Sequence, residues 1–445
     1  MDNEKKVVLC YSRDTLEPVE LLEEDRFLNM LVIGPTGTGK SSQIFTPLIF
    51  QDLMNQDCGV TVIDPKEDLA EFIYSLRDDF PTRNIIYVDP TNEFCPKINP
   101  FKGSEEVVIK NLLKIFSPTF LTTSNAEKQE IELNRNLLIK SITLLKRFPS
   151  LCGDNLNIKT FADFISNRYN EPRAKIAKLV EVLKRESKSF DLVDICEWFL
   201  FQFFEPRTGL YEKCSYLRTR IEELATNVYL SRILTPENKD NNVLNFDEHL
   251  AKGDVVIINT KNTILGHLGK TFGEFIMLSY LNSVFRRKHY SAEKKITELK
   301  PNFLYVDEFS TFSPVLTDLF TQGRAFKIGI HIAVQNRTLL RMCGGEDSEK
   351  QAFLIEANAR NIVVFPGLNG EDVKYYSEQF FNLSPQQIMY RPFGQIVYRI
   401  VKNRTVQLPA IGLVFFIDEV PHTNSIEQEF NGESARILPS SIGGR

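Results

Sequence analysis

Residues 30–43 read Met-Leu-Val-Ile-Gly-Pro-Thr-Gly-Thr-Gly-Lys-Ser-Ser-Gln. A short apolar run is followed here by a glycine-rich segment that carries one lysine and two serines. The apolar run at 31–33 is typical of a buried strand, and residues 34–41 fit the pattern Gly-x-x-x-x-Gly-Lys-Ser/Thr, after which a helix is expected. A strand, a glycine-rich turn and a helix in this order form the phosphate-binding P-loop.

Each residue type in this turn has a role in holding nucleotide phosphates. Gly34, Gly37 and Gly39 let backbone N–H groups face an anion, and the helix that begins near Lys40 directs the positive end of its dipole there. We expect Lys40 to contact the β- and γ-phosphates and Ser41 to bind Mg²⁺. An ordinary glycine-rich turn is the alternative, but the apolar strand and the filled motif positions favour a P-loop. The predicted nucleotide-binding residues are Gly34, Pro35, Thr36, Gly37, Thr38, Gly39, Lys40, Ser41 and Ser42.

Two further apolar runs end in the dipeptide Asp-Pro. Residues 59–63 are followed by Asp64-Pro65-Lys66, and residues 84–88 are followed by Asp89-Pro90. Strands that end in this way before a helix or loop are typical of a parallel α/β sheet whose carboxyl ends line one edge. Other strands are predicted at 6–11, 254–259, 302–306, 328–334, 361–365, 395–400 and 412–416. Helices are predicted at 43–53 and 269–285, with a basic run at 286–288 and a charged loop after the second.

Long segments with helical spacing replace the strands between residues 103 and 236. They lie at 107–115, 130–147, 173–185 and 215–233. We therefore predict a nucleotide-binding domain in two parts, 1–103 and 237–420, an all-α insertion at 104–236, and a flexible tail at 421–445. Residues 104–235 hold 20 Lys and Arg against 17 Asp and Glu, a net charge of +3, whereas the remainder carries −8.

The composition narrows the class of protein. The 445 residues suffice for two domains or for one large α/β domain with an insertion. A net charge of −5 gives no whole-molecule attraction to nucleic acid or anionic membranes. The seven cysteines include no Cys-x-x-Cys pair, which favours reduced thiols and argues against a zinc site. No apolar stretch approaches the roughly 18 residues of a membrane-spanning helix, and the polar start does not resemble a signal peptide, so we expect a soluble, intracellular protein.

Two adjacent carboxylates follow the predicted strand at 302–306. They are Asp307 and Glu308, at the strand end that faces the ligand edge of a parallel sheet. An apolar run that ends in Asp-Glu is common by itself, but together with the P-loop it indicates a Walker B motif. We expect Asp307 to hold Mg²⁺, directly or through water, and Glu308 to orient or polarise the attacking water.

Two more residues are catalytic candidates. Gln335 ends the predicted strand at 328–334, so its amide would lie near the γ-phosphate if that strand is a parallel neighbour; the alternative is a plain polar strand end. Arg324 lies 11 residues before Gln335. It could be an arginine finger that reaches a neighbouring subunit, a solvated loop arginine, or a contact to nucleic-acid phosphate.

The ordered set of motifs resembles the type IV coupling proteins. These are the TraG/TraD-like ATPases that recruit DNA or protein cargo to type IV secretion machines, within a wider P-loop group that includes FtsK-like DNA translocases. The resemblance covers roughly residues 28–400 and also includes an all-α insertion. The matching features are the P-loop at 34–41, Asp64-Pro65-Lys66, Val306-Asp307-Glu308-Phe309, Gly323-Arg324, the strand ending in Gln335, and the strand at 361–365 followed by Glu371-Asp372.

The resemblance implies a RecA-like nucleotide-binding domain and an all-α domain that faces the cytoplasm. It further implies a hexamer with ATP at the subunit interfaces and DNA passing through or along the ring. Many relatives begin with transmembrane helices, which this chain lacks, so either such helices have been removed or the protein docks on a separate membrane anchor. Some relatives use a long acidic tail for cargo choice; this chain has only a short tail, and its cargo stays open.

Basic residues of the insertion are candidates for DNA contact. They could meet phosphates, in which case binding should weaken with salt, or they could belong to a solvated amphipathic helix face. The aromatic stretch at 198–204 is too densely apolar for one exposed face, and we predict that it belongs to the core rather than to a base-stacking platform. The basic candidates are Arg168, Arg173, Lys175, Lys178, Lys184, Arg185 and Lys188, opposed by Glu171, Glu181 and Glu186.

The sequence thus predicts a RecA-like α/β P-loop NTPase with a mostly parallel sheet and an all-α insertion. Its expected cofactors are ATP and Mg²⁺. The expected function is an ATPase that recruits and drives DNA, or a relaxase-type DNA–protein conjugate, into a type IV secretion channel at the inner face of the membrane. A nucleotide-gated cargo receptor and an assembly ATPase of the same system are the alternatives.

Overall fold

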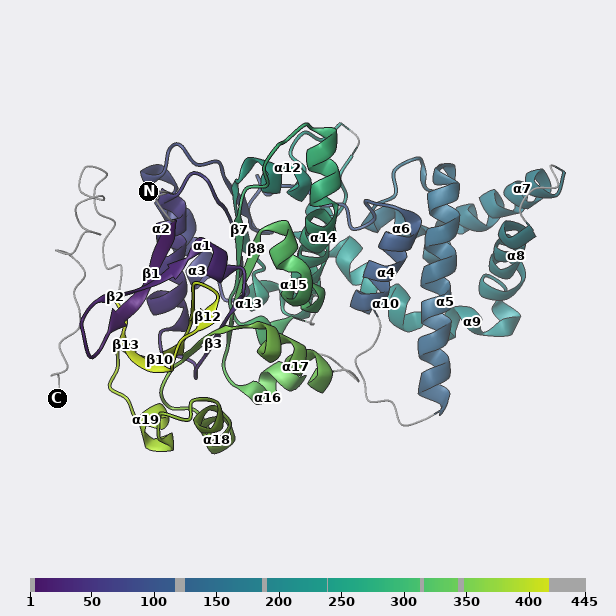
Figure 1. The fold of residues 1–445 in the computed structure, drawn as a ribbon. Helices are drawn as coiled ribbons and strands as arrows, with labels where there is room; N and C mark the ends of the chain where they lie inside the picture. The colour runs from purple at the N-terminus through teal and green to yellow at the C-terminus, as the bar shows by residue number, and fades with distance from the viewer. Residues whose placement is uncertain are drawn as a thin grey trace. The chain divides into compact units, whose positions relative to one another are not determined.

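The computed structural model describes residues 5–116, 125–185, 190–237, 239–312, 316–342 and 348–415. The chain forms two compact units (Figure 1). The first comprises the residues up to Asp89, Asn245–Gly273 and the residues from Met277 onward. The second comprises Pro90–Leu244 and Glu274–Ile276. Helix α14 (His267–Glu293) contributes residues to both.

The first unit is built on one mixed sheet. Its order, among the described residues, is β2-β1-β13-β10-β9-β3-β8-β7-β4-β6-β5. The strands from β9 to β5 in this order run parallel, whereas β10, β13, β1 and β2 pair antiparallel at one side. The bounds are β1 Lys6–Ser12, β2 Pro18–Leu22, β3 Met30–Ile33, β4 Gly59–Asp64, β5 Ile85–Val88, β6 Val255–Asn259, β7 Asn302–Val306, β8 Ile328–Val334, β9 Asn361–Val364, β10 Gln395–Arg399 and β13 Ala410–Leu413.

The central parallel strands end at a common edge. In the β3–β8 pair, Ile33 lies beside Val334. In the β4–β7 pair, Ile63 lies beside Val306. The loops that leave these four strands therefore start at the edge where open parallel sheets bind their ligands. This register confirms the predicted mostly parallel sheet and the parallel neighbourhood of β7 and β8.

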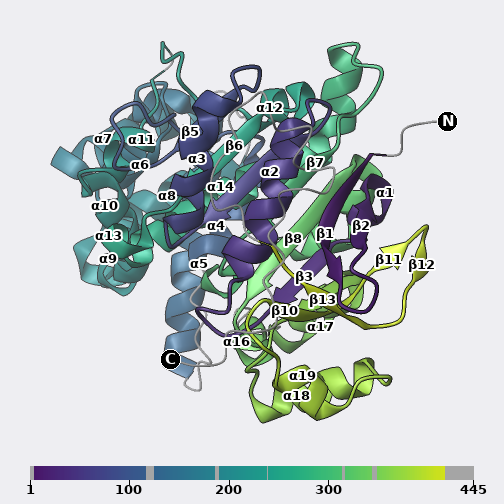
Figure 2. The ribbon, with the colours of Figure 1, turned by 90° about the vertical axis from the view of Figure 1, so that its left-hand side faces the viewer.

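Helices cover both faces of the sheet. One face shares a core with α2 (Thr46–Met54) and α3 (Asp68–Ser75), to which β4 contributes the alternate residues Val60 and Val62. Figures 1 and 2 show α14, α15 (Thr317–Gln322) and α17 (Ser348–Asn358) on the other face. Strands covered on both faces read as continuous apolar runs, which is why they stand out in the sequence. The unit also contains α1 Glu23–Arg26, α12 Phe246–Lys252, α13 Asn262–Leu265, α16 Arg337–Met342, α18 Gly370–Gln379, α19 Pro385–Met389 and the hairpin strands β11 Val401–Lys402 and β12 Thr405–Val406.

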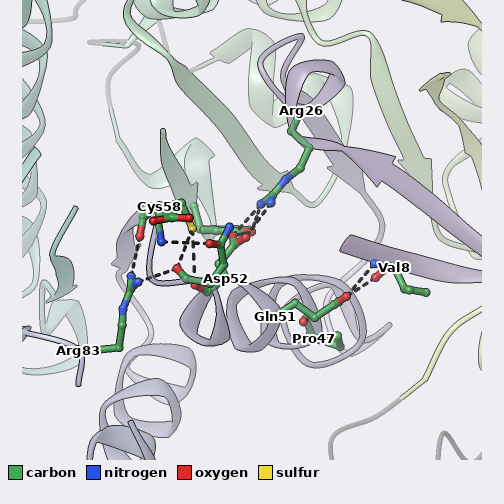
Figure 3. Close-up of polar contacts among 10 residues, drawn as sticks. Val8, Arg26, Pro47, Gln51, Asp52, Cys58 and Arg83 are labelled. Atoms are coloured by element: carbon green, nitrogen blue, oxygen red, sulfur yellow. Dashed lines mark hydrogen bonds and ion pairs between the residues drawn. The ribbon is translucent and has the colours of Figure 1, made fainter. Parts of the chain in front are cut away.

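A buried ion pair joins α1, α2 and β7. The Arg26 guanidinium donates from Nη1 and Nη2 to the two carboxylate oxygens of Asp52, each at 2.7 Å. The Tyr305 hydroxyl donates to Asp52 Oδ2 at 2.6 Å. Figure 3 shows the Arg26–Asp52 pair beside Cys58, whose carbonyl accepts a bond from Arg83 at 2.7 Å. The amino-terminal segment, the helix after the P-loop and the strand before Asp307 are thereby tied together.

The second unit confirms the predicted all-α insertion. Helix α6 (Ile158–Ile165) has a capping box in which Asn157 and Thr160 bond to each other's backbone N–H groups. Within the predicted core stretch Phe199, Phe203 and Phe204 are buried, whereas Phe201 is 65% exposed. The helices are α4 Glu105–Phe116, α5 Asn125–Arg147, α6 Ile158–Ile165, α7 Glu171–Arg185, α8 Phe190–Trp198, α9 Leu210–Lys213, α10 Ser215–Thr226 and α11 Leu230–Ile233.

Two predicted helices have the wrong extent. The predicted helix 269–285 continues as α14 to Glu293 and includes the basic run placed after it, because the Arg287 side chain is buried and donates to the carbonyls of Phe326, Leu250 and Lys300. The predicted helix 215–233 is interrupted, because Asn227 has an extended backbone. The domain boundaries 1–103, 104–236 and 237–420 stay predictions, and the predicted tail at 421–445 lies outside the described residues.

Candidate nucleotide-binding site

The glycine-rich turn leaves β3 between two close neighbours. The Gly34 N–H donates to the carbonyl of Val334 at 3.2 Å, and a Cβ on Gly34 would lie only 2.5 Å from Cβ of Phe365. Gly39 has a φ of 99°, in the left-handed region that favours glycine. A helix begins directly after it, with a wide π-type turn at Lys40–Phe45 and regular α geometry from Thr46. The predicted order of strand, turn and helix is therefore present.

Lys40 lies buried at the start of that helix. Its Nζ donates to the carbonyls of Gly34 at 2.8 Å and Pro35 at 3.1 Å. Burial lowers the pKa of Lys40, while the nearby carboxylates of Glu308 and Asp307 act in the opposite direction. Among the described residues its hydrogen-bond partners are these loop carbonyls, which it can exchange for a phosphate without breaking an ion pair. The residues of the turn thus fit a nucleotide phosphate.

A second feature of the turn also fits a ligand. Gln43 is fully buried, and its amide nitrogen and oxygen have no hydrogen-bond partner among the described residues. The amide would lie 2.5 Å from a Cβ on Gly39, so it lies directly against the turn. Buried polar groups normally have partners. The exception here lies beside the proposed phosphate cradle. Thr36 belongs to the same turn, Ser42 lies in the first turn of the helix that follows, and Thr38 Oγ1 donates to the Pro35 carbonyl at 2.8 Å.

The two predicted Mg²⁺ ligands lie together. Ser41 Oγ donates to Asp307 Oδ2 at 2.5 Å, although the two residues are 266 positions apart. Asp307 is 4% exposed. Burial raises the pKa of its carboxyl, and the hydrogen bond from Ser41 opposes that shift. A hydroxyl and a carboxylate are the oxygen ligands that Mg²⁺ prefers, so the pair fits the ion.

Glu308 is held at both carboxylate oxygens. Its backbone has a φ of 43°, and its side chain is 7% exposed. Gln335 Nε2 donates to Glu308 Oε2 at 2.8 Å, and Lys66 Nζ donates to Oε1 at 2.5 Å. The sheet brings Lys66 from the end of β4 and Gln335 from the end of β8, on the two sides of β7. Gln335 therefore lies at the predicted site, where its amide contacts the catalytic candidate Glu308.

Arg324 lies apart from this cluster. It is exposed in the short helical turn Gly323–Phe326, directly before β8. Gln335 directly follows the same strand, and seven residues of strand span roughly 23 Å. The structure thus places Arg324 toward the opposite edge of the sheet from the Gln335 end. Within one chain it does not join the cluster of Lys40, Asp307 and Glu308.

Sequence reasoning did not include Lys66 or Asp64 among the site residues. Asp64 is fully buried, and its carboxylate accepts the N–H groups of Lys66 at 2.8 Å and Ala70 at 3.0 Å. Burial raises the pKa of Asp64 to about 6, and the charge of Asp307 adds to the shift. A signal was available, because Asp64-Pro65-Lys66 directly follows a strand of the same parallel sheet.

The basic candidates of the insertion are mostly paired with acids. Arg168 contacts Asp163, Arg173 contacts Glu205, Lys175 contacts Glu171, and Lys184 contacts Glu197. Lys178 and Arg185 lie exposed on α7, and Lys188 lies outside the described residues. These pairs are what a solvated amphipathic face provides. They support that alternative over a dedicated DNA contact.

The fold is that of the RecA-like α/β class, and the sheet edge carries a glycine-rich turn beside the Asp307-Glu308 strand end. A family model described as type IV secretory system conjugative DNA transfer matches residues 3–192. A comparison with curated proteins finds no match. The family model covers 190 of the 445 residues.

Similar solved structures extend over nearly the whole chain. The bacterial conjugative coupling protein TrwB, in the unbound form TrwBdeltaN70, has a TM-score of 0.64 at 15% identity and covers 95% of this chain and 91% of its own. TrwB in complex with ADP and Mg²⁺ has a TM-score of 0.62 at 14% identity, covering 94% and 91%. VirB4 of Thermoanaerobacter pseudethanolicus has a TM-score of 0.53 at 13% identity, covering 95% and 99%. At these identities the likeness shows the fold.

In the part of the chain that the structure describes, no helix combines the length and the apolar character that crossing a membrane requires.

Proposed function

We propose that the chain is an ATP-hydrolysing coupling protein that delivers DNA, or a DNA–protein conjugate, to a type IV secretion channel. The observation that carries the proposal is the cluster at the sheet edge, where Ser41 meets Asp307 and Gln335 meets Glu308. The family match at 3–192 and the fold of TrwB support the cargo and the channel. TrwB has been captured with ADP and Mg²⁺ and with a non-hydrolysable ATP analogue, which supports ATP and Mg²⁺ as the ligands here.

Each residue of the cluster has a role in the proposed reaction. Lys40 exchanges its loop carbonyls for the β- and γ-phosphates, and Ser41 and Asp307 hold Mg²⁺. Bound Mg²⁺ neutralises charge that develops on the phosphate oxygens. Glu308 orients the attacking water, whose oxygen bonds to the γ-phosphorus while the bond to the bridging oxygen breaks. ADP leaves with that electron pair, and the water proton passes to Glu308. Gln335 senses the γ-phosphate through its bond to Glu308.

Replacing Lys40 by Ala tests the site. We expect turnover of Mg-ATP to be abolished, because the lysine is the cation that the turn presents to the phosphates. The measurement is phosphate release at saturating ATP. A matched control is Lys252→Met, which removes an exposed lysine that pairs with Glu248 on α12. Undiminished hydrolysis by the Lys40→Ala protein would refute the assignment.

The assembly and location are further parts of the proposal. We propose a hexamer whose members share nucleotide sites, with Arg324 acting on the neighbour's nucleotide, because its place before β8 separates it from the site of its own chain. We also propose a relaxase-type cargo and recruitment to the inner face of the membrane through a separate anchor. The resemblance to coupling proteins supports these partners.

One observation favours a second candidate function. Four of the seven basic candidates in the insertion, Arg168, Arg173, Lys175 and Lys184, are engaged by acids of the same unit, which leaves fewer of them for DNA. A cargo receptor, or an assembly ATPase of the secretion system, would need no such surface. Slow turnover that is indifferent to DNA would favour this candidate over the DNA motor.

A further inference from the structure

Lys66 reaches the catalytic candidate from a neighbouring strand. Its side chain is 45% exposed, yet its Nζ lies 2.5 Å from Oε1 of Glu308, whose side chain is 7% exposed. Lys66 directly follows the Asp64-Pro65 end of β4, and Glu308 follows β7, to which β4 is paired. A cation thus extends from the solvent side of the sheet edge onto a buried carboxylate that the proposed mechanism uses.

The loop that presents Lys66 is firmly held. The buried carboxylate of Asp64 accepts the Lys66 N–H at 2.8 Å. The next residue, Glu67, has a φ of 81°, a strained conformation that persists only where its surroundings enforce it. Lys261, whose side chain is 8% exposed, enforces it by contacting Glu67 Oε2 at 2.6 Å and Glu71 Oε1 at 2.7 Å. Lys66 is therefore preorganised toward Glu308.

Two lysines approach the same space in front of the sheet edge. Lys66 contacts Glu308, Asp307 is adjacent to Glu308 in sequence and accepts from Ser41, and Lys40 is adjacent to Ser41. Burial lowers the pKa of Lys40, and the positive charge of Lys66 acts in the same direction. Like charges that face one space are stabilised by an anion between them. The terminal phosphate of ATP is such an anion, and ADP lacks it.

We propose that Lys66 is a positioning residue that switches between Glu308 and the γ-phosphate. With no nucleotide bound, Lys66 holds Glu308 Oε1. When Mg-ATP binds, its ammonium group moves to the γ-phosphate, and Glu308 Oε1 becomes available to the attacking water. The γ-phosphate carries more negative charge than the carboxylate, so the ion pair gained is stronger than the one given up, and the exchange occurs only with a triphosphate. This inference rests on the proposed ATPase function and adds a reason why the site discriminates ATP from ADP.

The test compares a non-hydrolysable ATP analogue with ADP, each with Mg²⁺. Lys66→Met keeps the stem and removes the charge, which leaves Glu308 facing the γ-phosphate without a counter-charge. We expect the analogue to bind at least about tenfold more weakly, the value of one lost charge-assisted bond, with ADP unchanged within about twofold. The kcat for ATP should fall by a similar factor, and Lys66→Arg should restore part of both.

Glu308→Gln should change the affinity for the analogue in the opposite direction. Lys66 then gives up no ion pair when it moves to the phosphate, so the analogue should bind more tightly than to the wild type, and adding Lys66→Met should cancel the gain. Lys252→Met, which removes an exposed lysine far along the chain, should change neither affinity.

Two results would overturn the switch. One is that Lys66→Met changes neither the analogue affinity nor the ADP affinity. The other is an equal loss of both affinities, which would show a merely structural role. If Lys66→Met showed the predicted selective loss of analogue affinity but the wild type released no phosphate, the switch would stand and the proposed ATPase function would fail. Wild-type hydrolysis with an unaltered ratio in Lys66→Met would mean the reverse.

Discussion

Asp52 is the single residue on which the buried polar network depends. Its carboxylate accepts two bonds from Arg26 and one from Tyr305, and all three side chains are almost fully buried. Replacing Asp52 by Ala leaves the Arg26 charge buried without a counter-charge, so we expect the unfolding free energy of the first unit to fall by about 3–5 kcal/mol. Urea unfolding, followed by far-UV circular dichroism, measures this loss.

The control is Asp57→Ala, which removes an exposed acid that pairs with Lys5 at 2.9 Å. An exposed pair contributes less than about 1 kcal/mol. Equal effects of the two substitutions on the unfolding free energy would contradict the large stabilisation that is assigned to the buried pair.

Asp64 makes stability depend on pH. Burial raises its pKa from 3.8 to about 6, so between these values the folded state binds more protons than the unfolded state. Stability contributed by the neutral carboxyl is therefore present below pH 4 and is lost as the pH rises through about 6, by up to about 3 kcal/mol for two pKa units. Asp64→Asn cannot titrate. The unfolding free energy of the wild type relative to this variant should fall across that window in Mg²⁺-free buffer, whereas a constant difference would contradict the shift.

Among the elements, the junction of turn and helix at Gly39 is the most constrained. An alanine here would have to keep the backbone φ of 99°, and its Cβ would lie 2.5 Å from the amide of the buried Gln43. Gly39→Ala must therefore displace Gln43 and distort the turn, and we expect nucleotide affinity to fall at least about tenfold. Isothermal titration with ADP and Mg²⁺ measures the change.

Gly209→Ala is the matched control for backbone strain. Gly209 has a φ of 63° with nothing within 4 Å of an added Cβ, and it belongs to the second unit. The Gly209→Ala substitution should lower the free energy of unfolding by about 1 kcal/mol and leave nucleotide affinity unchanged. A Gly39→Ala protein that binds ADP as well as this control would show that the turn tolerates a side chain.

The strands that are buried on both faces were the ones that could be predicted from the sequence. The parallel strands were predicted because both faces are covered, so that β3 and most of β6 read as continuous apolar runs. The antiparallel strand β2 was missed, because its residues are mostly half exposed and carry no such run. Helix α14 was predicted too short, because the carbonyl partners of Arg287 are distant in sequence. Such partners are known only once the chain has folded.

Contacts between residues that are distant in sequence also limited the prediction of the site. Lys40, Ser41, Asp307 and Glu308 were proposed from sequence because the P-loop and the Asp-Glu strand end are local patterns. The contact of Lys66 with Glu308 joins residues 242 positions apart and depends on β4 lying beside β7. One sequence without its strand order does not provide that pairing, so Lys66 was noted only as part of a motif.

At the scale of the whole molecule, one chain does not bring every candidate together. Lys40, Asp307, Glu308 and Gln335 meet at one edge, whereas Arg324 precedes β8 and lies toward the other. A ring in which that other edge of one subunit faces the nucleotide of the next would unite them. This arrangement would also link nucleotide turnover to motion between subunits, which a DNA motor needs.

The most direct test of the central claim is the ATPase rate with and without single- and double-stranded DNA, across a range of salt. The account predicts strong stimulation by DNA that weakens as salt rises and that is lost in Glu308→Gln, because that variant cannot orient the attacking water. A protein that hydrolyses ATP at the same rate with and without DNA would contradict the DNA motor and leave the cargo receptor or assembly ATPase.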